Sequence, residues 1–600
     1  MCGISGVINS EILNKDIDVV KYMSNIISHR GPDETSNFIR DKIFIEFKRL
    51  SIVGVKNGSQ PFLSENKNVA VFVNGEIYNF KEIKSKLSKL FKFKTESDCE
   101  VILHLYLKFG IDFLKEIKGM YLILIYDYEK RKIFFIRDRI GEKPIYFLKN
   151  DKKLIFCSEI KGFSFLKDSN DSFINYDAIY RYLVFQYFLE PETPFKNIFK
   201  LPSGCYMEIN LDNLDYNIKE YWTYENSVAI DKPKIELSNQ FEESIKLLAE
   251  CSDVPISVSV SGGIDSCLVC SVLKKNNIKF TAFNISYEES IQNDDTRNAE
   301  RFCRYLNIPL NKINLSDADV KKTFLPTCFN LDEPIADLAS IGYNAIFSTI
   351  NQNGKKVVIQ GHGVDELFWG YEWVKKIFLA KKNIILKFFL FLIYKIKINE
   401  ILFNKDFLFS ILYLKFFFKK DKNYFIELNN FLNKSYSPSL SHPNNIVKSL
   451  CKTYLQSNGI TQGERLSMAN SIELRLPYID YRLIENIFYL REYSYLRNDF
   501  KLPQKYFFKK IAKIFLPLFI TNRKKRGFSP PARKWFNIIF KEYGFLLQDG
   551  LLVKLGIISN KSAYRMSKGP NFIDYFTTNT PMCYKYLILE IWFKKFFGKI

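Results

Sequence analysis

The stretch ISVSVSGGIDS at residues 256–266 decides the fold of the larger part of this chain. It predicts a strand over 256–260 that runs through a glycine turn into a helix. A second strand is expected over 280–285, and a third, over 356–359, again ends in a glycine turn. Strands that alternate with helices in this way predict a doubly wound α/β fold with a parallel sheet. Such sheets bind ligands at the carboxyl ends of their strands, so the active site is expected at these two turns.

The first glycine turn, residues 261–266, has the features of a phosphate-binding loop. Backbone N–H groups and the positive end of the following helix face one anion site there. The turn lacks the glycine spacing of a Walker loop and that of a dinucleotide-binding loop. After the second turn, Asp365 is expected to join Asp265 in holding Mg²⁺ on a bound phosphate group, because a hard cation prefers carboxylate and phosphate oxygen.

The residues before this α/β region predict a different architecture. Short β-rich runs occur over 69–73, 121–126 and 133–137, and one helical pattern lies between them at 100–109. This order favours sheets covered by a few helices rather than alternating βαβ units. A linker is expected over 206–234, between a first domain at 2–205 and a second at 235–600.

The chain begins Met1-Cys2-Gly3-Ile4, which places a cysteine where removal of Met1 would expose it. Cys2 would then carry both a thiol and a free α-amine, whose pKa of about 7.7 to 8.0 suits it to accept the thiol proton. One residue would supply nucleophile and base.

Residues further along supply what capture of an amino-acid amide requires. Arg49 offers a fork of donors to an α-carboxylate, and Glu76 or Asp98 can hold an α-ammonium. The Asn74 amide and the Gly75 backbone N–H can form an oxyanion hole.

Because these residues occur in this order, residues 2–205 resemble the N-terminal-nucleophile glutaminase domain of class II glutamine amidotransferases. The resemblance implies an α+β sandwich of αββα layers in which Cys2 attacks glutamine, forms a glutamyl thioester and releases ammonia. It also places Ile52 and Val53 among the glutamine-binding residues. Phe47 and Lys48 depart from the pattern, since relatives often have His-Glu before the arginine.

Four motifs of the second domain occur in an order that resembles the synthetase domain of glutamine-dependent asparagine synthetases. They are the loop at 261–266, which resembles the pyrophosphate loop of adenylating ligases, the cluster QGHGVDELFWGY at 360–371, the stretch 465–477, and Lys505. The resemblance implies that ATP is cleaved to pyrophosphate with Lys505 on the phosphates. The ATP-binding residues it implies are Val260, Ser261, Gly262, Gly263, Asp265, Ser266, Ile285, Gln360 and Gly361.

The acceptor pocket is expected at His362, Asp365 and Glu366, and His362 departs from the pattern. Relatives carry an acid at this position, near the activated carboxylate and the amino group of aspartate, and a histidine does not replace that charge. The departure resembles synthetase homologues of surface-polysaccharide pathways, which are thought to amidate sugar uronates. Aspartate, a uronic acid sugar, and a catalytically silent basic scaffold are therefore three alternatives for the function.

Composition limits the partners and the compartment. The net charge of +22 suits a polyanionic partner, but no zinc-finger spacing or basic heptad region supports nucleic-acid binding. Eleven scattered cysteines and no apolar signal segment predict a reducing cytoplasm. The Phe- and Lys-rich insertion at 381–443 is expected to form packed helices, with an interfacial membrane-touching hairpin as the alternative. A homodimer is left open.

Overall fold

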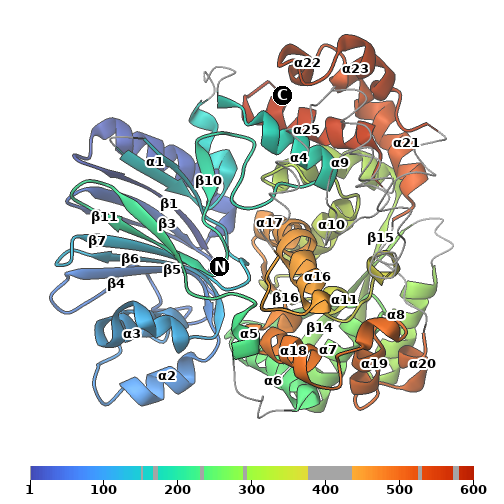
Figure 1. The fold of residues 1–600 in the computed structure, drawn as a ribbon, viewed down its shortest axis with the longest axis horizontal. Helices are drawn as coiled ribbons and strands as arrows, with labels where there is room; N and C mark the ends of the chain where they lie inside the picture. Colours follow the sequence, from blue (N-terminus) through green and yellow to red (C-terminus); the bar gives the residue numbers. More distant parts are fainter. Residues whose placement is uncertain are drawn as a thin grey trace.

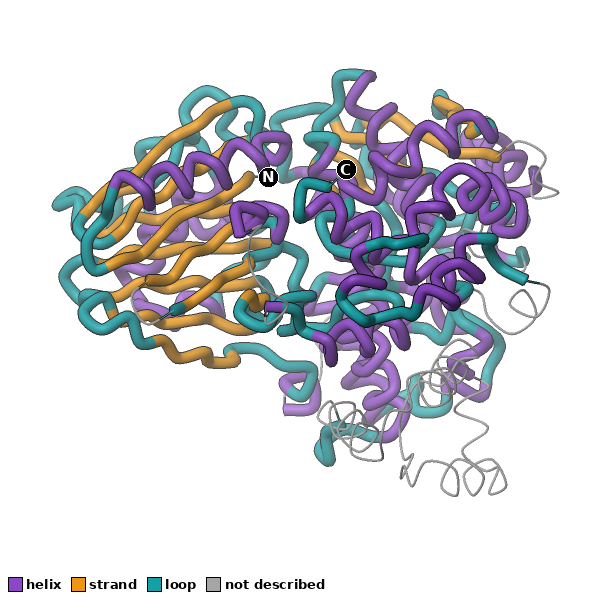
Figure 2. Tube along the Cα trace, turned by 90° about the horizontal axis from the view of Figure 1, so that it is seen from above, coloured by secondary structure: helices purple, strands orange, loops and turns teal. Residues whose placement is uncertain are grey.

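The computed structural model describes residues 2–150, 153–166, 173–229, 236–287, 293–375, 436–523, 530–571 and 580–599. The chain forms two halves that lie side by side, one rich in strands and one rich in helices (Figure 1, Figure 2). In both views the amino terminus lies where the two halves meet.

The first half is built on two antiparallel sheets of six strands each. One has the order β10-β8-β9-β1-β3-β2, made of Ile198–Lys200, Tyr146–Lys149, Lys153–Cys157, Cys2–Asn9, Ile43–Arg49 and Glu34–Arg40. The other has the order β12-β11-β7-β6-β5-β4, made of Tyr216–Glu220, Cys205–Asn210, Lys132–Arg137, Gly119–Asp127, Val69–Ile77 and Phe62–Leu63. Side chains of both sheets, such as Phe47 and Phe72, share one buried core.

Helices cover the outer faces of this sandwich. Helix α1 (Asn14–Ile26) packs on β1 and β3, and α3 (Val101–Phe109) packs on β5 with α2 (Phe80–Leu87) beside it (Figure 1). The layers are therefore αββα, which confirms the fold predicted for the first half.

The second half contains a parallel sheet of five strands in the order β15-β14-β13-β16-β17, made of Leu310–Leu315, Phe280–Tyr287, Ile256–Ser259, Val357–Ile359 and Glu473–Arg475. The three strands predicted from the sequence are its β13, β14 and β16. Helices connect and flank the strands, as a doubly wound fold requires. These helices include α6 (Leu237–Glu250), α7 (Ile264–Lys275), α8 (Asn293–Tyr305), α9 (Asp317–Asn330), α10 (Ala339–Gln352), α11 (Val364–Leu367), α16 (His442–Leu450), α17 (Thr461–Ala469) and α18 (Tyr481–Tyr493).

The expected linker at 206–234 is wrong over its first part, because β11 and β12 occupy 205–220. Residue Tyr206 pairs with Ile136 of β7, so this hairpin extends the second sheet of the sandwich rather than leaving it. Alternating burial along β11 agrees with a strand that has one buried face. Most of the predicted 381–443 insertion lies outside the described residues. Among the described helices, none is long and apolar enough to cross a membrane.

The last helix of the chain ties the two halves together. Helix α25 (Met582–Phe596) is buried almost throughout and packs against α4 (Tyr176–Phe185), which belongs to the first half. The Lys585 ammonium donates to the Leu183 carbonyl at 2.8 Å, and the Tyr182 hydroxyl donates to the Lys585 carbonyl at 3.0 Å. The core is therefore continuous from one half to the other.

A second tie is a buried arginine at the junction. The Arg30 guanidinium donates to Glu159 at 2.7 Å and forms an ion pair with Glu464 of α17. Its Nε atom also donates to the Cys2 carbonyl at 3.1 Å. Neither the guanidinium nor the Glu159 carboxylate is exposed beyond 1%.

We predict that Arg491→Met lowers the free energy of unfolding by about 3 to 5 kcal/mol, because it leaves the Asp499 carboxylate buried without its charged partner. Arg491 Nη2 lies 2.8 Å from Asp499 Oδ2 and also donates to the Leu367 carbonyl at 2.6 Å. A urea titration followed by circular dichroism measures the change. The matched control is Lys86→Met, which removes an exposed pair with Glu82 and should leave the midpoint where it is. Equal midpoints for both variants would contradict the prediction.

Candidate active sites

The predicted nucleophile, Cys2, is the first residue of β1 and lies buried at the junction of the two halves. Its backbone N–H donates to the Asn74 side-chain oxygen at 2.8 Å. Burial raises the pKa of the thiol, although a hydrogen bond from Leu50 and the nearby Arg49 guanidinium oppose the rise. A thiol in this state needs a proton acceptor close by before it can attack.

Asn74 and Gly75, the residues predicted to form an oxyanion hole, belong to strand β5, and Asn74 is in contact with Cys2. The Asn74 Nδ2 group is buried and has no hydrogen-bond partner among the described residues, so it is a donor available to a ligand. Gly75 leaves no room for a side chain, since a Cβ atom there would lie 2.1 Å from the Met120 carbonyl oxygen.

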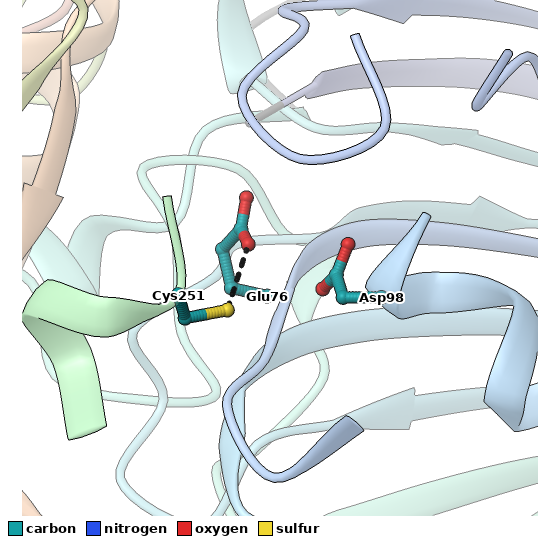
Figure 3. A group of neighbouring side chains, drawn as sticks. All are labelled: Glu76, Asp98 and Cys251. Atoms are coloured by element: carbon teal, nitrogen blue, oxygen red, sulfur yellow. Dashed lines mark hydrogen bonds between the residues drawn. The ribbon is translucent and has the colours of Figure 1, made fainter. Parts of the chain in front are cut away.

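Figure 3 shows the acidic pair predicted to hold an α-ammonium, together with a thiol that the sequence did not indicate. Glu76, Asp98 and Cys251 bring their polar atoms within 4.8 Å of one another. Burial and the Asp98 carboxylate raise the pKa of Glu76 well above its usual value, and burial also raises the pKa of Asp98. Two buried carboxylates that repel each other favour a cation between them, and an ammonium meets that need.

The other predicted glutamine-binding residues surround Arg49. The Arg49 Nη2 atom donates to the Gly54 carbonyl at 2.7 Å, and Nη1 lies 3.3 Å from a Glu34 carboxylate oxygen. Ile52 and Val53 are buried in the loop that supplies this carbonyl. The guanidinium is therefore held in place from one side by the loop.

The second predicted site is a cavity of about 490 Å³ at the carboxyl ends of β13 and β16. All but one of the residues predicted there line it, namely Val260, Ser261, Gly263, Asp265, Ser266, Ile285, Gln360, Gly361, His362, Asp365, Glu366 and Lys505. Gly262 does not line the cavity. A Cβ atom at Gly262 would lie 2.5 Å from the Asp295 carbonyl oxygen, so this glycine allows the loop to pack closely on α8.

Lys505 joins the two predicted magnesium ligands. Its Nζ atom lies 2.6 Å from Asp265 Oδ2 and 2.8 Å from Asp365 Oδ1. The Asp265 Oδ1 atom is buried and accepts no hydrogen bond within the described parts of the chain. The two aspartates thus offer carboxylate oxygens at the phosphate loop, one of them without a described partner. Oxygens of this kind are the hard ligands that Mg²⁺ prefers.

The acceptor side of the cavity contains partners that the sequence did not indicate. The Tyr343 hydroxyl lies 3.1 Å from His362 Nε2, and the Tyr371 hydroxyl donates to Glu366 at 2.8 Å. Burial and the adjacent Asp365 raise the pKa of Glu366 to about 7. Further lining residues, none of them predicted as a site residue, are Asp295, Asp337, Trp373, Tyr454, Asn458, Gln462, Lys509 and Arg523.

Arg523 shows why these residues escaped sequence reasoning. It donates to the Gly262 carbonyl at 2.9 Å and forms an ion pair with Asp295, so it braces the phosphate loop from 261 residues further along the chain. One arginine in a lysine- and arginine-rich run carries no local signal of such a role.

Both halves match models of known protein families. Residues 1–222 match the glutamine amidotransferase domain, and residues 236–594 match asparagine synthase. The chain belongs to the asparagine synthase family. It is a glutamine-hydrolysing ligase of that family, with an αββα glutamine amidotransferase domain as its first half.

Curated relatives agree with the assignment to the asparagine synthase family. Glutamine-hydrolyzing asparagine synthetase 2 of Bacillus subtilis (strain 168) is 30% identical over 513 residues, which are 81% of this chain and 66% of that protein. Glutamine-hydrolyzing asparagine synthetase 1 of the same strain is 27% identical over 571 residues, 90% of this chain and 89% of that protein. A putative glutamine-hydrolyzing asparagine synthetase 2 of Methanocaldococcus jannaschii is 32% identical over 402 residues, 62% and 76% of the two chains.

We predict that Asn74→Ala lowers the turnover of glutamine hydrolysis about 100- to 1000-fold, because it removes the donor aimed at the developing oxyanion. Glutamate release in the absence of ATP measures the loss. The control is Asn68→Ala, a change at an exposed amide that bonds to Glu129 at 2.6 Å. Turnover of Asn74→Ala within tenfold of the unsubstituted protein would exclude an oxyanion role for this amide.

Proposed function

We propose that this protein releases ammonia from glutamine at Cys2 and uses ATP to amidate a carboxylate, with aspartate as the first candidate acceptor. The observation that carries the proposal is the pairing of two built sites in one chain. One holds a buried thiol beside an amide donor with no described partner, and the other is a cavity of about 490 Å³ in which a lysine joins two carboxylates.

At the first site, removal of Met1 would convert the Cys2 backbone N–H into an α-amine. That amine takes the thiol proton, and the sulfur attacks the carboxamide carbon of glutamine. The oxygen that becomes negative accepts hydrogen bonds from Asn74 Nδ2 and the Gly75 N–H. The α-ammonium gives the thiol proton to the leaving nitrogen, and ammonia departs. Water then hydrolyses the glutamyl thioester to glutamate and restores the thiol.

At the second site, an oxygen of the acceptor carboxylate attacks the α-phosphorus of ATP, and pyrophosphate leaves. Asp265 and Asp365 would hold Mg²⁺, which neutralises charge on the leaving pyrophosphate when it is bound. Lys505 donates to phosphate oxygens from its position between the two carboxylates. Ammonia attacks the carbonyl carbon of the resulting acyl-adenylate, and AMP leaves.

Two acids support aspartate as the acceptor although residue 362 is a histidine. Asp337 and Glu366 both line the cavity and can pair with an α-ammonium. The Asp337 carboxylate is fixed by the Asn458 amide at 3.1 Å and by the Ala339 N–H at 3.0 Å. Asp337 can therefore pair with the α-ammonium in place of the acid that most relatives carry at position 362.

A uronic acid sugar is the second candidate acceptor, as in O-antigen or other surface-polysaccharide biosynthesis. It is favoured by His362 and by an aromatic group of Tyr371, Trp373 and Tyr454 at the cavity wall. Tyr371 and Trp373 are stacked with ring centroids 5.9 Å apart, and Tyr454 meets Tyr371 edge-on at 5.5 Å. Such faces cover the apolar side of a sugar ring.

The silent-scaffold alternative is disfavoured, because a decayed enzyme has no reason to keep both sets of reactive groups. A cytoplasmic location, a homodimer and a peripheral membrane contact through the 381–443 insertion stay predictions from the sequence.

We predict that Cys2→Ala abolishes glutamine-dependent amidation and leaves ammonia-dependent amidation intact, because the thiol serves only to release ammonia. Asp265→Asn should have the reverse effect, with amidation lost and glutamate release retained. Amidated product is measured with glutamine and with ammonium chloride as the nitrogen source, and glutamate release is measured with glutamine. Together these assays separate the effects of the two variants. If a folded Cys2→Ala protein lost both activities, the division of labour between the sites would be refuted.

We predict that aspartate supports pyrophosphate release from ATP, and that His362→Glu changes the KM for aspartate less than twofold, since the Asp337 carboxylate already offers a partner for the α-ammonium. A nucleotide-linked uronate is the parallel substrate in the same assay. Release with the uronate alone, together with a gain of aspartate use in His362→Glu, would replace aspartate by the sugar acid.

A further inference from the structure

The loop after β3, residues 50–58, supports the glutamine site. Its Gly54 carbonyl accepts a hydrogen bond from Arg49. The backbone N–H groups of Ser51 and Gly54 donate to aspartates at the junction of the two halves. Gly54 has a φ of +60°, and a Cβ atom there would lie 2.6 Å from the Ser97 nitrogen. Gly54 thus allows the tight turn whose carbonyl accepts the hydrogen bond from Arg49.

Two residues of the second half hold this loop. Asp253 is bonded to it twice, since its carboxylate accepts from the Gly54 N–H at 2.9 Å and its own N–H donates to the Ile52 carbonyl at 3.1 Å. Lys356 pairs with Asp33 at 2.7 Å, and the same Asp33 oxygen accepts from the Ser51 N–H at 2.7 Å.

The acidic pair is also reached from the second half. Arg475 lies 3.7 Å from Glu76, and the Cys251 thiol donates to Glu76 at 3.6 Å. Arg475 and Glu76 are both buried, so this charge is little screened by solvent. The subsites expected for the α-carboxylate and the α-ammonium therefore each border on residues beyond the first half.

The two loop contacts come from the amino ends of β13 and β16, which are neighbouring strands of the parallel sheet. Asp253 lies just before β13, and Lys356 immediately precedes β16. The carboxyl ends of the same two strands carry the loops that line the ATP cavity. The amino ends of these strands therefore reach the glutamine loop, directly through Asp253 and by way of Asp33 for Lys356, and their carboxyl ends reach the nucleotide site.

We propose that the glutamine site is composite, with Asp253 and Lys356 of the synthetase half acting as positioning residues for the loop that orients Arg49. This inference rests on the proposed glutamine hydrolysis at Cys2. The two residues touch no reacting atom. Their loss would leave the thiol and the oxyanion donors in place but would loosen the loop that binds the amino-acid end of glutamine.

The test is the steady-state release of glutamate from glutamine without ATP. We expect Asp253→Ala and Lys356→Met each to raise the KM for glutamine about fivefold, with kcat within twofold, because each removes a charge-assisted contact that is partly open to solvent. Asp253→Asn keeps an acceptor oxygen and should restore the KM to within twofold of the unsubstituted protein. The matched control is Lys355→Met, the neighbouring lysine that is not the partner of Asp33.

Ammonia-dependent pyrophosphate release is the second readout, because it reports on the other site. A raised KM for glutamine with unchanged ammonia-dependent release supports positioning. An unchanged KM in both variants, or equal loss of the two activities, overturns it. If the unsubstituted protein releases no glutamate, the proposed function itself fails, and the inference fails with it.

Discussion

The rest of the structure depends on the buried Arg30 guanidinium. A buried charge is tolerated only when partners compensate for the water it has lost, and Arg30 has three of them. Cys2 and Glu159 belong to the sandwich, whereas Glu464 belongs to α17 of the synthetase half. Glu464 also pairs with Arg465, which lies 3.3 Å from Asp332. Separating the halves would therefore break the buried ion pair between Arg30 and Glu464 and expose the surfaces that keep it from water.

Local sequence patterns were sufficient for several of the elements and for the two glycine turns. Val69–Ile77, Gly119–Asp127 and Ile256–Ser259 are strands where alternation or β-branched runs predicted them, and the residues expected in the ATP site, except Gly262, line one cavity. The hairpin of β11 and β12 was missed, because its Asn- and Asp-rich turn resembles a linker and only pairing with β7 makes it part of a sheet.

Contacts between the two halves could not be predicted in this way. Nothing near Glu464 in the sequence indicates that it meets Arg30, and Asp337 lies in no motif that suggested a ligand. Their roles arise from the packing of elements hundreds of residues apart. Such charges acquire a function only once the two folded halves exclude water from the space between them.

The burial of α25 between the halves has a consequence for how the protein is made. Helix α4 is synthesised early, yet its Tyr182 hydroxyl and Leu183 carbonyl find their partners on Lys585, some 400 positions later. On the ribosome, the first half therefore carries an exposed apolar helix face throughout the synthesis of the second half. Completion of its core waits for translation of the final helix, so a growing chain is open to chaperones and to aggregation for most of its synthesis.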